Sequence, residues 1–169
     1  MWPLDSDIPK RAEEYAKVYV ISLHSRLGFG KDGTVWQTSA DTALKVSRIP
    51  EPFGRELAAY RRLADRGVAT INGFAVPRLV RADERHLAIE MSIVSPPFVL
   101  DFGCARLDGD RVEFSEEVME EWLADKREEF GDRWPVVAGV LSSLRRLGIH
   151  MTDVHPGNIM FENPTIGPA

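Results

Sequence analysis

Two successive prolines near the middle of the chain separate two stretches with different hydrophobic patterns. Pro96 and Pro97 follow Ser95, and such a pair interrupts both a strand ladder and a helix. The pattern before them predicts several short strands with one main helix, and the pattern after them is mainly helical. We therefore expect an α+β fold, with a β-rich N-lobe over residues 1–95 and a hinge and much reduced, mainly helical C-lobe over residues 96–169.

Short apolar, β-branched runs and helical stripes place the individual elements. In the first part we predict a helix-compatible stretch at Ile8–Lys17 and a helix that starts at Pro50 and Pro52 and continues over Arg55–Arg66. We predict strands at Val18–Leu23, Thr34–Thr38, Asp41–Ser47, Pro77–Arg81 and His86–Val94. In the second part we predict helices at Ser115–Phe130 and Trp134–Leu147, then a loop from Ile149 and a short strand at Asn158–Phe161.

Composition sets limits on the partners of the chain. The hydrophobic fraction of 44% is enough for a core in a chain of 169 residues. The net charge of −5 argues against broad binding to nucleic acid or to an anionic membrane. A single cysteine, Cys104, excludes an intramolecular disulfide framework, and no apolar run is long enough to cross a bilayer. We therefore expect a cytoplasmic protein, and the oligomeric state stays open.

The segment Gly28–Val35 contains three closely spaced glycines, Gly28, Gly30 and Gly33. Glycines at such positions let backbone amides approach phosphate oxygens closely. Dinucleotide folds use a similar spacing, but there the loop leads into a helix. Here it leads into the strand pattern Thr34–Thr38, which favours a hairpin loop over phosphates; an ordinary glycine turn is the alternative.

Lys45 lies within an apolar strand pattern, where an ammonium group needs an anionic partner. Glu56 follows eleven positions later on the predicted helix. A Lys–Glu pair there would hold the ammonium toward nucleotide phosphates. Glu51 is a competitor, but it lies between two prolines, and an exposed lysine and a solvated glutamate remain the simpler alternative for each residue taken alone.

The segment Gly148–Met160 has an Asp and an Asn separated by four residues, between a helix and a short apolar strand. Asp153 can accept or orient the proton of a nucleophile, and the side-chain oxygen of Asn158 can join a metal shell. Pro156 and Gly157 supply a sharp turn between them. A surface turn with an incidental Asp–Asn pair is the alternative.

Together these residues resemble the protein-kinase-like superfamily, with the motifs in the same order along the chain. The segment Asp153–Asn158 is most similar to the H-G-D-L-H-P-x-N loop of aminoglycoside phosphotransferases and related bacterial kinases. The resemblance implies ATP and Mg²⁺ as cofactors, Lys45 on the α/β-phosphates, Glu56 as its partner, Asp153 as catalytic base and Asn158 as a magnesium ligand. It also implies nucleotide contacts from Gly28, Phe29, Gly30, Gly33 and Val35, and from the strand end leading to the hinge, with Glu90 and Ser92, where adenine would meet the backbone.

One motif stands out of order. The family has an Asp-Phe-Gly magnesium loop after the catalytic loop, whereas here Asp101-Phe102-Gly103 precedes it. Three interpretations are open: Asp101 reaches the metal through a rearranged topology or a swapped partner, it lines the nucleotide mouth near the ribose, or the triplet is a chance turn. Glu162, just beyond the short strand, is an alternative metal ligand by position alone.

Two further differences from the kinase-like family leave three functional hypotheses open. Met151 occupies the position where the family usually has a histidine, and the expected C-lobe is small. The first hypothesis is an ATP-dependent phosphotransferase acting on an unknown small-molecule or protein hydroxyl. The second is a catalytically weak pseudokinase that binds nucleotide and acts through protein interaction. The third is a small α+β binding domain without a nucleotide site.

Overall fold

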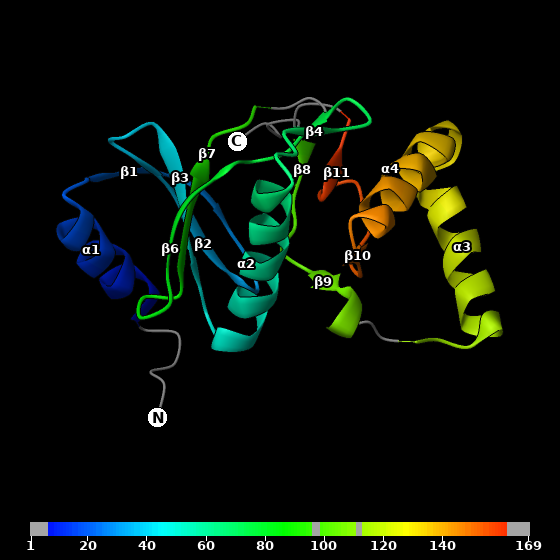
Figure 1. Ribbon diagram of the computed structural model, residues 1–169, viewed down its shortest axis with the longest axis horizontal. Coiled ribbons are helices and arrows are strands. Elements are labelled where there is room, and N and C mark those ends of the chain that lie inside the picture. The colour runs from blue at the N-terminus through cyan, green and yellow to red at the C-terminus, as the bar shows by residue number, and fades with distance from the viewer. Residues whose placement is uncertain (1–6, 96–98, 111–112, 162–169) are drawn as a thin grey trace, which may run out of the picture.

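The computed structural model describes residues 7–95, 99–110 and 113–161. It confirms the predicted α+β class: a β-rich first part with its helices is followed by a small, mainly helical second part (Figure 1). The first part contains a five-stranded antiparallel sheet in the order β1-β2-β3-β7-β6. Its strands are β1 (Leu23–Phe29), β2 (Gly33–Thr38), β3 (Thr42–Ser47), β6 (Leu79–Asp83) and β7 (Ala88–Ser92).

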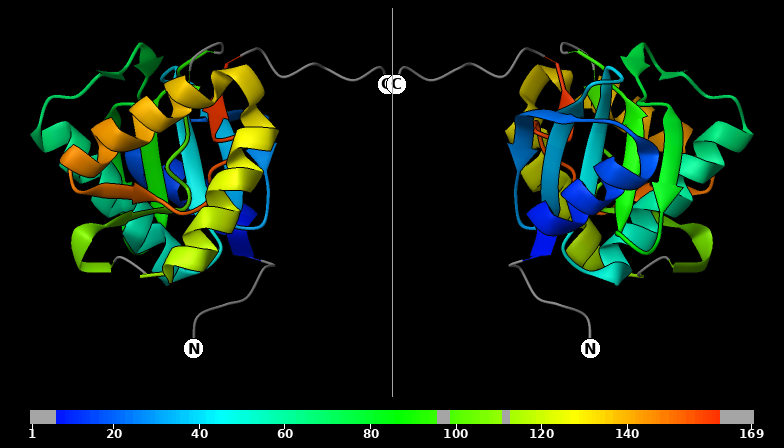
Figure 2. Two further views of the ribbon diagram at one scale, coloured as in Figure 1. Left: turned by 90° about the vertical axis from the view of Figure 1, so that its right-hand side faces the viewer. Right: turned by 90° about the vertical axis from the view of Figure 1, so that its left-hand side faces the viewer.

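Two helices cover opposite faces of this sheet, α1 (Ile8–Tyr19) on one face and α2 (Pro50–Asp65) on the other (Figure 2). Side chains of a strand point alternately to the two faces. Leu44 and Val46 of β3 accordingly pack into the cluster that includes α1, while Ala43 packs into the cluster that includes α2. Lys45 has the parity of Ala43 and lies on the α2 face.

The predicted strand Val18–Leu23 is wrong. Helix α1 continues to Tyr19 because Ile8, Ala12 and Tyr15, at helical spacing, are buried against the sheet. Val20 then adopts a left-handed conformation with φ of 56°, which ends the helix. The first strand begins only at Leu23.

Helix α2 begins at Pro50, where the sequence predicted that a helix would start. Proline is accepted in the first turn of a helix, where its missing N–H has no intrahelical partner. Phe53, Leu57 and Leu63 are buried along one side of the helix. This stripe fixes which face of α2 meets the sheet, and therefore where Glu56 lies.

The second part combines short strands with a helical pair. The predicted loop from Ile149 contains a strand instead, and the short strand predicted at Asn158–Phe161 is only Ile159–Met160. The remaining elements are β4 (Thr70–Ile71), β5 (Phe74–Ala75), β8 (Val99–Leu100), β9 (Ala105–Leu107), η2 (Asp108–Asp110), α3 (Glu116–Phe130), η3 (Gly131–Arg133), α4 (Trp134–Arg146), β10 (Ile149–Met151) and β11 (Ile159–Met160).

Two small sheets connect the segments of the second part. One pairs β10 with β9, and the other has the order β11-β8-β5-β4. A single cluster of buried side chains runs from the α2 face of the large sheet to α4, and includes Ile89, Leu57, Leu100 and Val140. Across residues 7–95, 99–110 and 113–161, no helix combines the length and the apolar character that a membrane span requires.

Candidate active site

Lys45 and Glu56 form a buried ion pair between β3 and α2. Lys45 Nζ lies 2.7 Å from Glu56 Oε2 and donates to Glu56 Oε1 at 2.8 Å. Burial acts to lower the pKa of Lys45, but the carboxylates of Glu56 and Asp101 outweigh it, and the pKa is raised above 10.5. The ammonium therefore stays charged at neutral pH. The competitor Glu51 is exposed and pairs with Arg55.

The glycine-rich segment forms the tip of the β1–β2 hairpin. This confirms the prediction that a strand, and not a helix, follows the glycines. The strand β1 extends to Phe29, so the turn itself is short, and Gly30 N donates to Gly33 O at 2.9 Å across it. Phe29 is 80% exposed at this tip. Val35 is the direct cross-strand neighbour of Lys45 and packs against the core cluster on the α2 face.

The three glycines differ in what surrounds them. A Cβ at Gly33 would lie 2.3 Å from Val46 O, so the close approach of β2 and β3 itself demands glycine there. A Cβ at Gly28 or Gly30 would meet no other atom within 4 Å. The packing of this chain therefore explains Gly33 but leaves open space beside Gly28 and Gly30.

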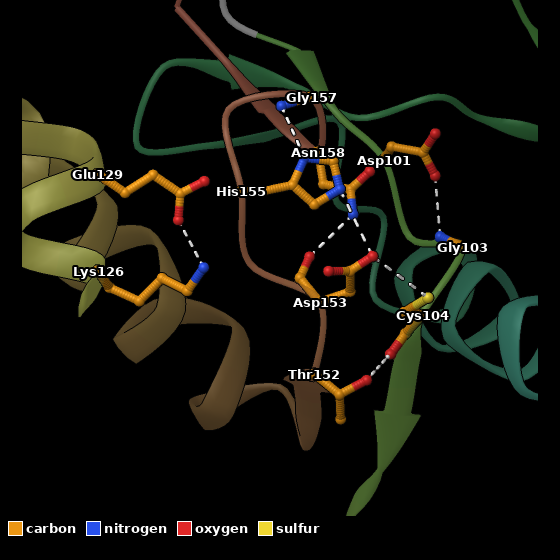
Figure 3. A network of polar contacts seen from close by, with 10 residues as sticks. All are labelled: Asp101, Gly103, Cys104, Lys126, Glu129, Thr152, Asp153, His155, Gly157 and Asn158. Carbon is orange, nitrogen blue, oxygen red and sulfur yellow. Dashed lines mark hydrogen bonds and ion pairs between the residues drawn. The ribbon is translucent and has the colours of Figure 1, made fainter. Parts of the chain in front are cut away.

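The segment Thr152–Asn158 is folded back on itself by its own polar groups (Figure 3). Asn158 Nδ2 donates to Asp153 O at 2.8 Å, and Gly157 N donates to His155 Nδ1 at 3.0 Å. The side chain of Asp153 is 57% exposed, with Oδ2 3.5 Å from His155 Nε2. The turn thus holds the Asn158 amide against the backbone of Asp153, as the predicted Pro156–Gly157 turn requires, while the Asp153 carboxylate stays open to solvent.

Strand pairing brings the upstream Asp-Phe-Gly triplet to this same segment. β8 precedes the triplet and pairs with β11, which follows Asn158; β9 follows the triplet and pairs with β10, which precedes Asp153. As a result Asp101 N donates to Asn158 O at 2.9 Å. The carboxylate of Asp101 in turn accepts from Gly103 N at 2.8 Å (Figure 3).

Asp101 also lies beside the Lys45–Glu56 pair. A Cβ placed on Gly103 would be 3.2 Å from Lys45 Nζ and 3.3 Å from Asp101 Oδ1, so these groups share one small volume. Phe102 is fully buried, with its ring edge-on to Tyr60 of α2 at a centroid distance of 5.6 Å. An incidental surface turn would not have a buried phenylalanine and a carboxylate beside a buried ion pair. The triplet therefore lies between the Lys45–Glu56 pair and the Asp153–Asn158 segment.

Two predicted nucleotide contacts lie on the far face of the sheet. Glu90 accepts hydrogen bonds from Tyr15 and Thr42, each at 2.7 Å, in the buried layer under α1. Ser92 Oγ accepts from Arg78 N at 2.9 Å. The side chains of Glu90 and Ser92 therefore point away from Lys45, which leaves only backbone near the strand end for the predicted adenine contact.

Cys104 lies next to Asp153, although the two residues are far apart in the sequence. Its Sγ is 3.9 Å from Asp153 Oδ2, and Thr152 Oγ1 donates to Cys104 O at 2.7 Å. Burial, followed by the nearby carboxylates of Asp32 and Asp153, raises the pKa of the thiol. The raised pKa keeps the thiol protonated at neutral pH.

The side-chain oxygens of Asp101 and Asn158 are of the hard type that Mg²⁺ prefers. Mg²⁺ is often held by one or two carboxylates together with substrate phosphates. Within the described parts of the chain, no three His, Cys, Asp or Glu side chains are grouped to hold a metal by themselves. The alternative ligand Glu162 lies outside the described residues.

No protein-family model and no curated protein sequence matches this chain. Two solved structures are similar to it. One is the ternary complex of APH(2")-IIa with streptomycin and ATP, with 18% identity, a TM-score of 0.40, and coverage of 85% of this chain and 42% of that one. The other is the gentamicin complex of APH(2")-IIa, with 16% identity, a TM-score of 0.44, and coverage of 93% and 43%. The chain thus spans less than half the length of these proteins, and the chemistry of the site follows from the chain's own contacts.

Proposed function

We propose that this chain is an ATP- and Mg²⁺-dependent phosphotransferase that transfers the γ-phosphoryl group to a hydroxyl acceptor. The observation that carries this proposal is that the β8–β11 and β9–β10 pairings join Asp101 to the Asp153–Asn158 segment, while Asp101 also lies beside Lys45. These contacts bring together residues that are far apart in sequence and in an unexpected order. A cation beside a carboxylate suits the charges of a nucleotide triphosphate with its metal ion.

The first half of the site would bind the nucleotide. Glu56 holds the Lys45 ammonium in place, and that charge would pair with the α- and β-phosphates. The open space beside Gly28 and Gly30 lets backbone amides of the hairpin approach phosphate oxygens. Val35 would cover the base, and adenine would hydrogen-bond to backbone beyond the end of β7.

The second half would carry the transfer. Asp153 would accept the proton of the acceptor hydroxyl as its oxygen bonds to the γ-phosphorus. The bond from that phosphorus to the bridging oxygen would break, and ADP would leave with the electron pair. The exposed carboxylate of Asp153 is reachable by an acceptor, and its Oδ2 lies 3.5 Å from His155 Nε2.

Asp101 and Asn158 would hold the magnesium ion, since their oxygens are the hard ligands that it prefers. When bound, the ion would neutralise charge on the phosphates. Asp101 is positioned for this from the backbone, because its N–H is bonded to Asn158 O and its carboxylate to Gly103 N.

The test is release of ADP from Mg²⁺-ATP, with autophosphorylation followed in parallel, for wild type and Asp153→Ala. We expect measurable turnover in wild type and a loss of about 10²-fold or more in the variant. Asp125→Ala, which removes an exposed carboxylate from α3, is the matched control and should retain activity.

Equal turnover in wild type and Asp153→Ala would contradict the proposal. A thermal shift with Mg²⁺-ATP but no turnover in any form would favour the pseudokinase alternative. The absence of a thermal shift with ATP, with and without Mg²⁺, would leave only a binding domain that lacks a nucleotide site.

A further inference from the structure

A cavity of about 650 Å³ is lined by residues of α3, α4 and the β9–β10 pair. This volume is within the range of about 300–1,000 Å³ that is usual for small-molecule sites. Thr152 forms part of its wall, and the next residue is Asp153. The cavity therefore adjoins the chain segment that leads directly into Asp153, the residue that would take the proton of an acceptor.

The walls of the cavity are largely apolar and partly aromatic. Trp122 and Met119 line it from α3, and Leu141 lines it from α4. Trp122 is held by an edge-on contact with Trp134 at a centroid distance of 6.2 Å. Such a surface favours an apolar or aromatic body over a fully hydrated sugar-like one, because burial of apolar area stabilises the complex.

The charged groups of the cavity favour an anion. Arg145 is exposed on α4 and, within the described residues, has no carboxylate in ion-pair range. Arg106 Nη1 is 4.0 Å from Asp110 Oδ2, at the outer limit for an ion pair. Of the other charged or titratable groups, Glu113 supplies one carboxylate and His150 is bonded to Asp108 at 2.6 Å. The lining thus has two guanidinium groups and one carboxylate, that of Glu113, while Asp108 and Asp110, which contact His150 and Arg106, are not part of the lining.

We infer that this cavity is the acceptor site: it takes a small hydroxyl compound with an apolar or aromatic body and an anionic group, bound by Arg145 and Arg106. This inference rests on the proposed phosphotransferase function. The acceptor oxygen bonds to the γ-phosphorus of ATP, its proton passes to Asp153, and the bond to the bridging oxygen breaks to release ADP. A carboxylate or phosphate on the acceptor pairs with the arginines.

The test compares two probes of similar size and opposite charge, para-(hydroxymethyl)benzoate and para-(hydroxymethyl)benzylamine, titrated by ligand-observed NMR. We expect the benzoate to bind at least tenfold more tightly than the benzylamine, and Arg145→Gln to weaken benzoate binding by about fivefold or more. The matched control is Arg146→Gln, because Arg146 is bonded to Ser142 and Ser143, outside the cavity. It should bind the benzoate as wild type does.

The inference is overturned if the benzylamine binds as tightly as the benzoate, if the benzoate does not bind, or if Arg145→Gln and Arg146→Gln have equal effects. Lys45→Met separates this inference from the proposed function. It should abolish the thermal shift with Mg²⁺-ATP while benzoate binding stays unchanged. In wild type, benzoate binding without a thermal shift with ATP would contradict the proposed function, and a thermal shift without benzoate binding would contradict only the acceptor site.

Discussion

The two halves of the candidate site are assembled in different ways. Around Lys45, the groups come from β2, β3 and α2, which follow one another in the chain and pack as sequence neighbours. Around Asp153, the neighbours come from opposite ends of the second part; Cys104 and Asp153, which are in contact, are 49 positions apart. Two short strand pairings, β8–β11 and β9–β10, bring these residues together although they are distant in the sequence. The order of the motifs along the chain therefore does not determine which side chains lie near one another.

The Lys45–Glu56 pair tests the first half and has the largest expected effect. Glu56→Ala leaves the Lys45 ammonium buried without its partner, which costs about 3–5 kcal/mol in the free energy of unfolding. Glu51→Ala removes an exposed carboxylate from the same helix and should change it by less than about 1 kcal/mol. Urea unfolding followed by circular dichroism measures both variants.

A double variant sharpens this result. Replacing both charges, as in Lys45→Met with Glu56→Leu, leaves no unpaired buried charge and should be less destabilising than Glu56→Ala alone. If Glu56→Ala and Glu51→Ala have the same stability, the pair does not organise this half of the site.

Leu100 tests the second half, because it is fully buried in β8 and paired with Ile159 of β11. Leu100→Ala should lower the free energy of unfolding by about 2–4 kcal/mol and should also reduce ADP release, since the pairing positions Asp101. Val136→Ala, at an exposed position of α4, should change stability by about 0.5 kcal/mol or less. Full activity in a folded Leu100→Ala protein would argue against a positioning role for this strand pair.

Substitutions at the hairpin glycines distinguish a role in packing from a role in ATP binding. Gly33→Ala forces its Cβ against Val46 O, 2.3 Å away, and should destabilise the protein by about 1–3 kcal/mol. Gly30→Ala meets no atom within 4 Å, so its melting temperature should stay near that of wild type while ATP affinity falls. A Gly33→Ala protein as stable as Gly30→Ala would show that β2 and β3 can separate at this point.

The outer edge of the sheet is expected to show the smallest effect, and one that depends on pH. Burial acts to raise the pKa of Asp83, but hydrogen bonds from His86 and Tyr19 outweigh it and hold the pKa below 3.8. The ionised carboxylate therefore stabilises the fold above that value, and this contribution is lost as the pH falls through the lower folded-state pKa. Asp83→Asn should be less stable than wild type by about 1–2 kcal/mol at pH 7, and the difference should shrink toward pH 3. A difference that does not change with pH would contradict this assignment.

Local patterns were enough to predict the first half of the site. The period-two pattern around Lys45 and the apolar stripe of α2 fix which faces meet, and Glu56 follows from that. The error at Val18–Leu23 has the same origin, since the β-branched residues after Lys17 match a strand locally. Burial of Tyr15 on the sheet extends the helix across them instead.

Local patterns could not predict the second half. The strands that position Asp101 and Asn158 are two residues long, too short for a periodic signal, and their pairing is a tertiary contact. The sequence signal for the position of Asp101 was the Asp101-Phe102-Gly103 triplet itself, flanked by short apolar runs. The expected adenine contact near Glu90 and Ser92 was to the backbone, and it stays a prediction.

The most direct test of the shared site is the effect of Mg²⁺ on binding of a non-hydrolysable ATP analogue, measured by calorimetry for wild type and Asp101→Asn. We expect Mg²⁺ to strengthen binding to wild type by about tenfold or more, and to strengthen binding to Asp101→Asn little or not at all, with similar affinity for the metal-free nucleotide. The control Asp125→Asn should behave as wild type. An equal gain from Mg²⁺ in wild type and Asp101→Asn would contradict the claim that strand pairing brings the upstream triplet into the nucleotide site.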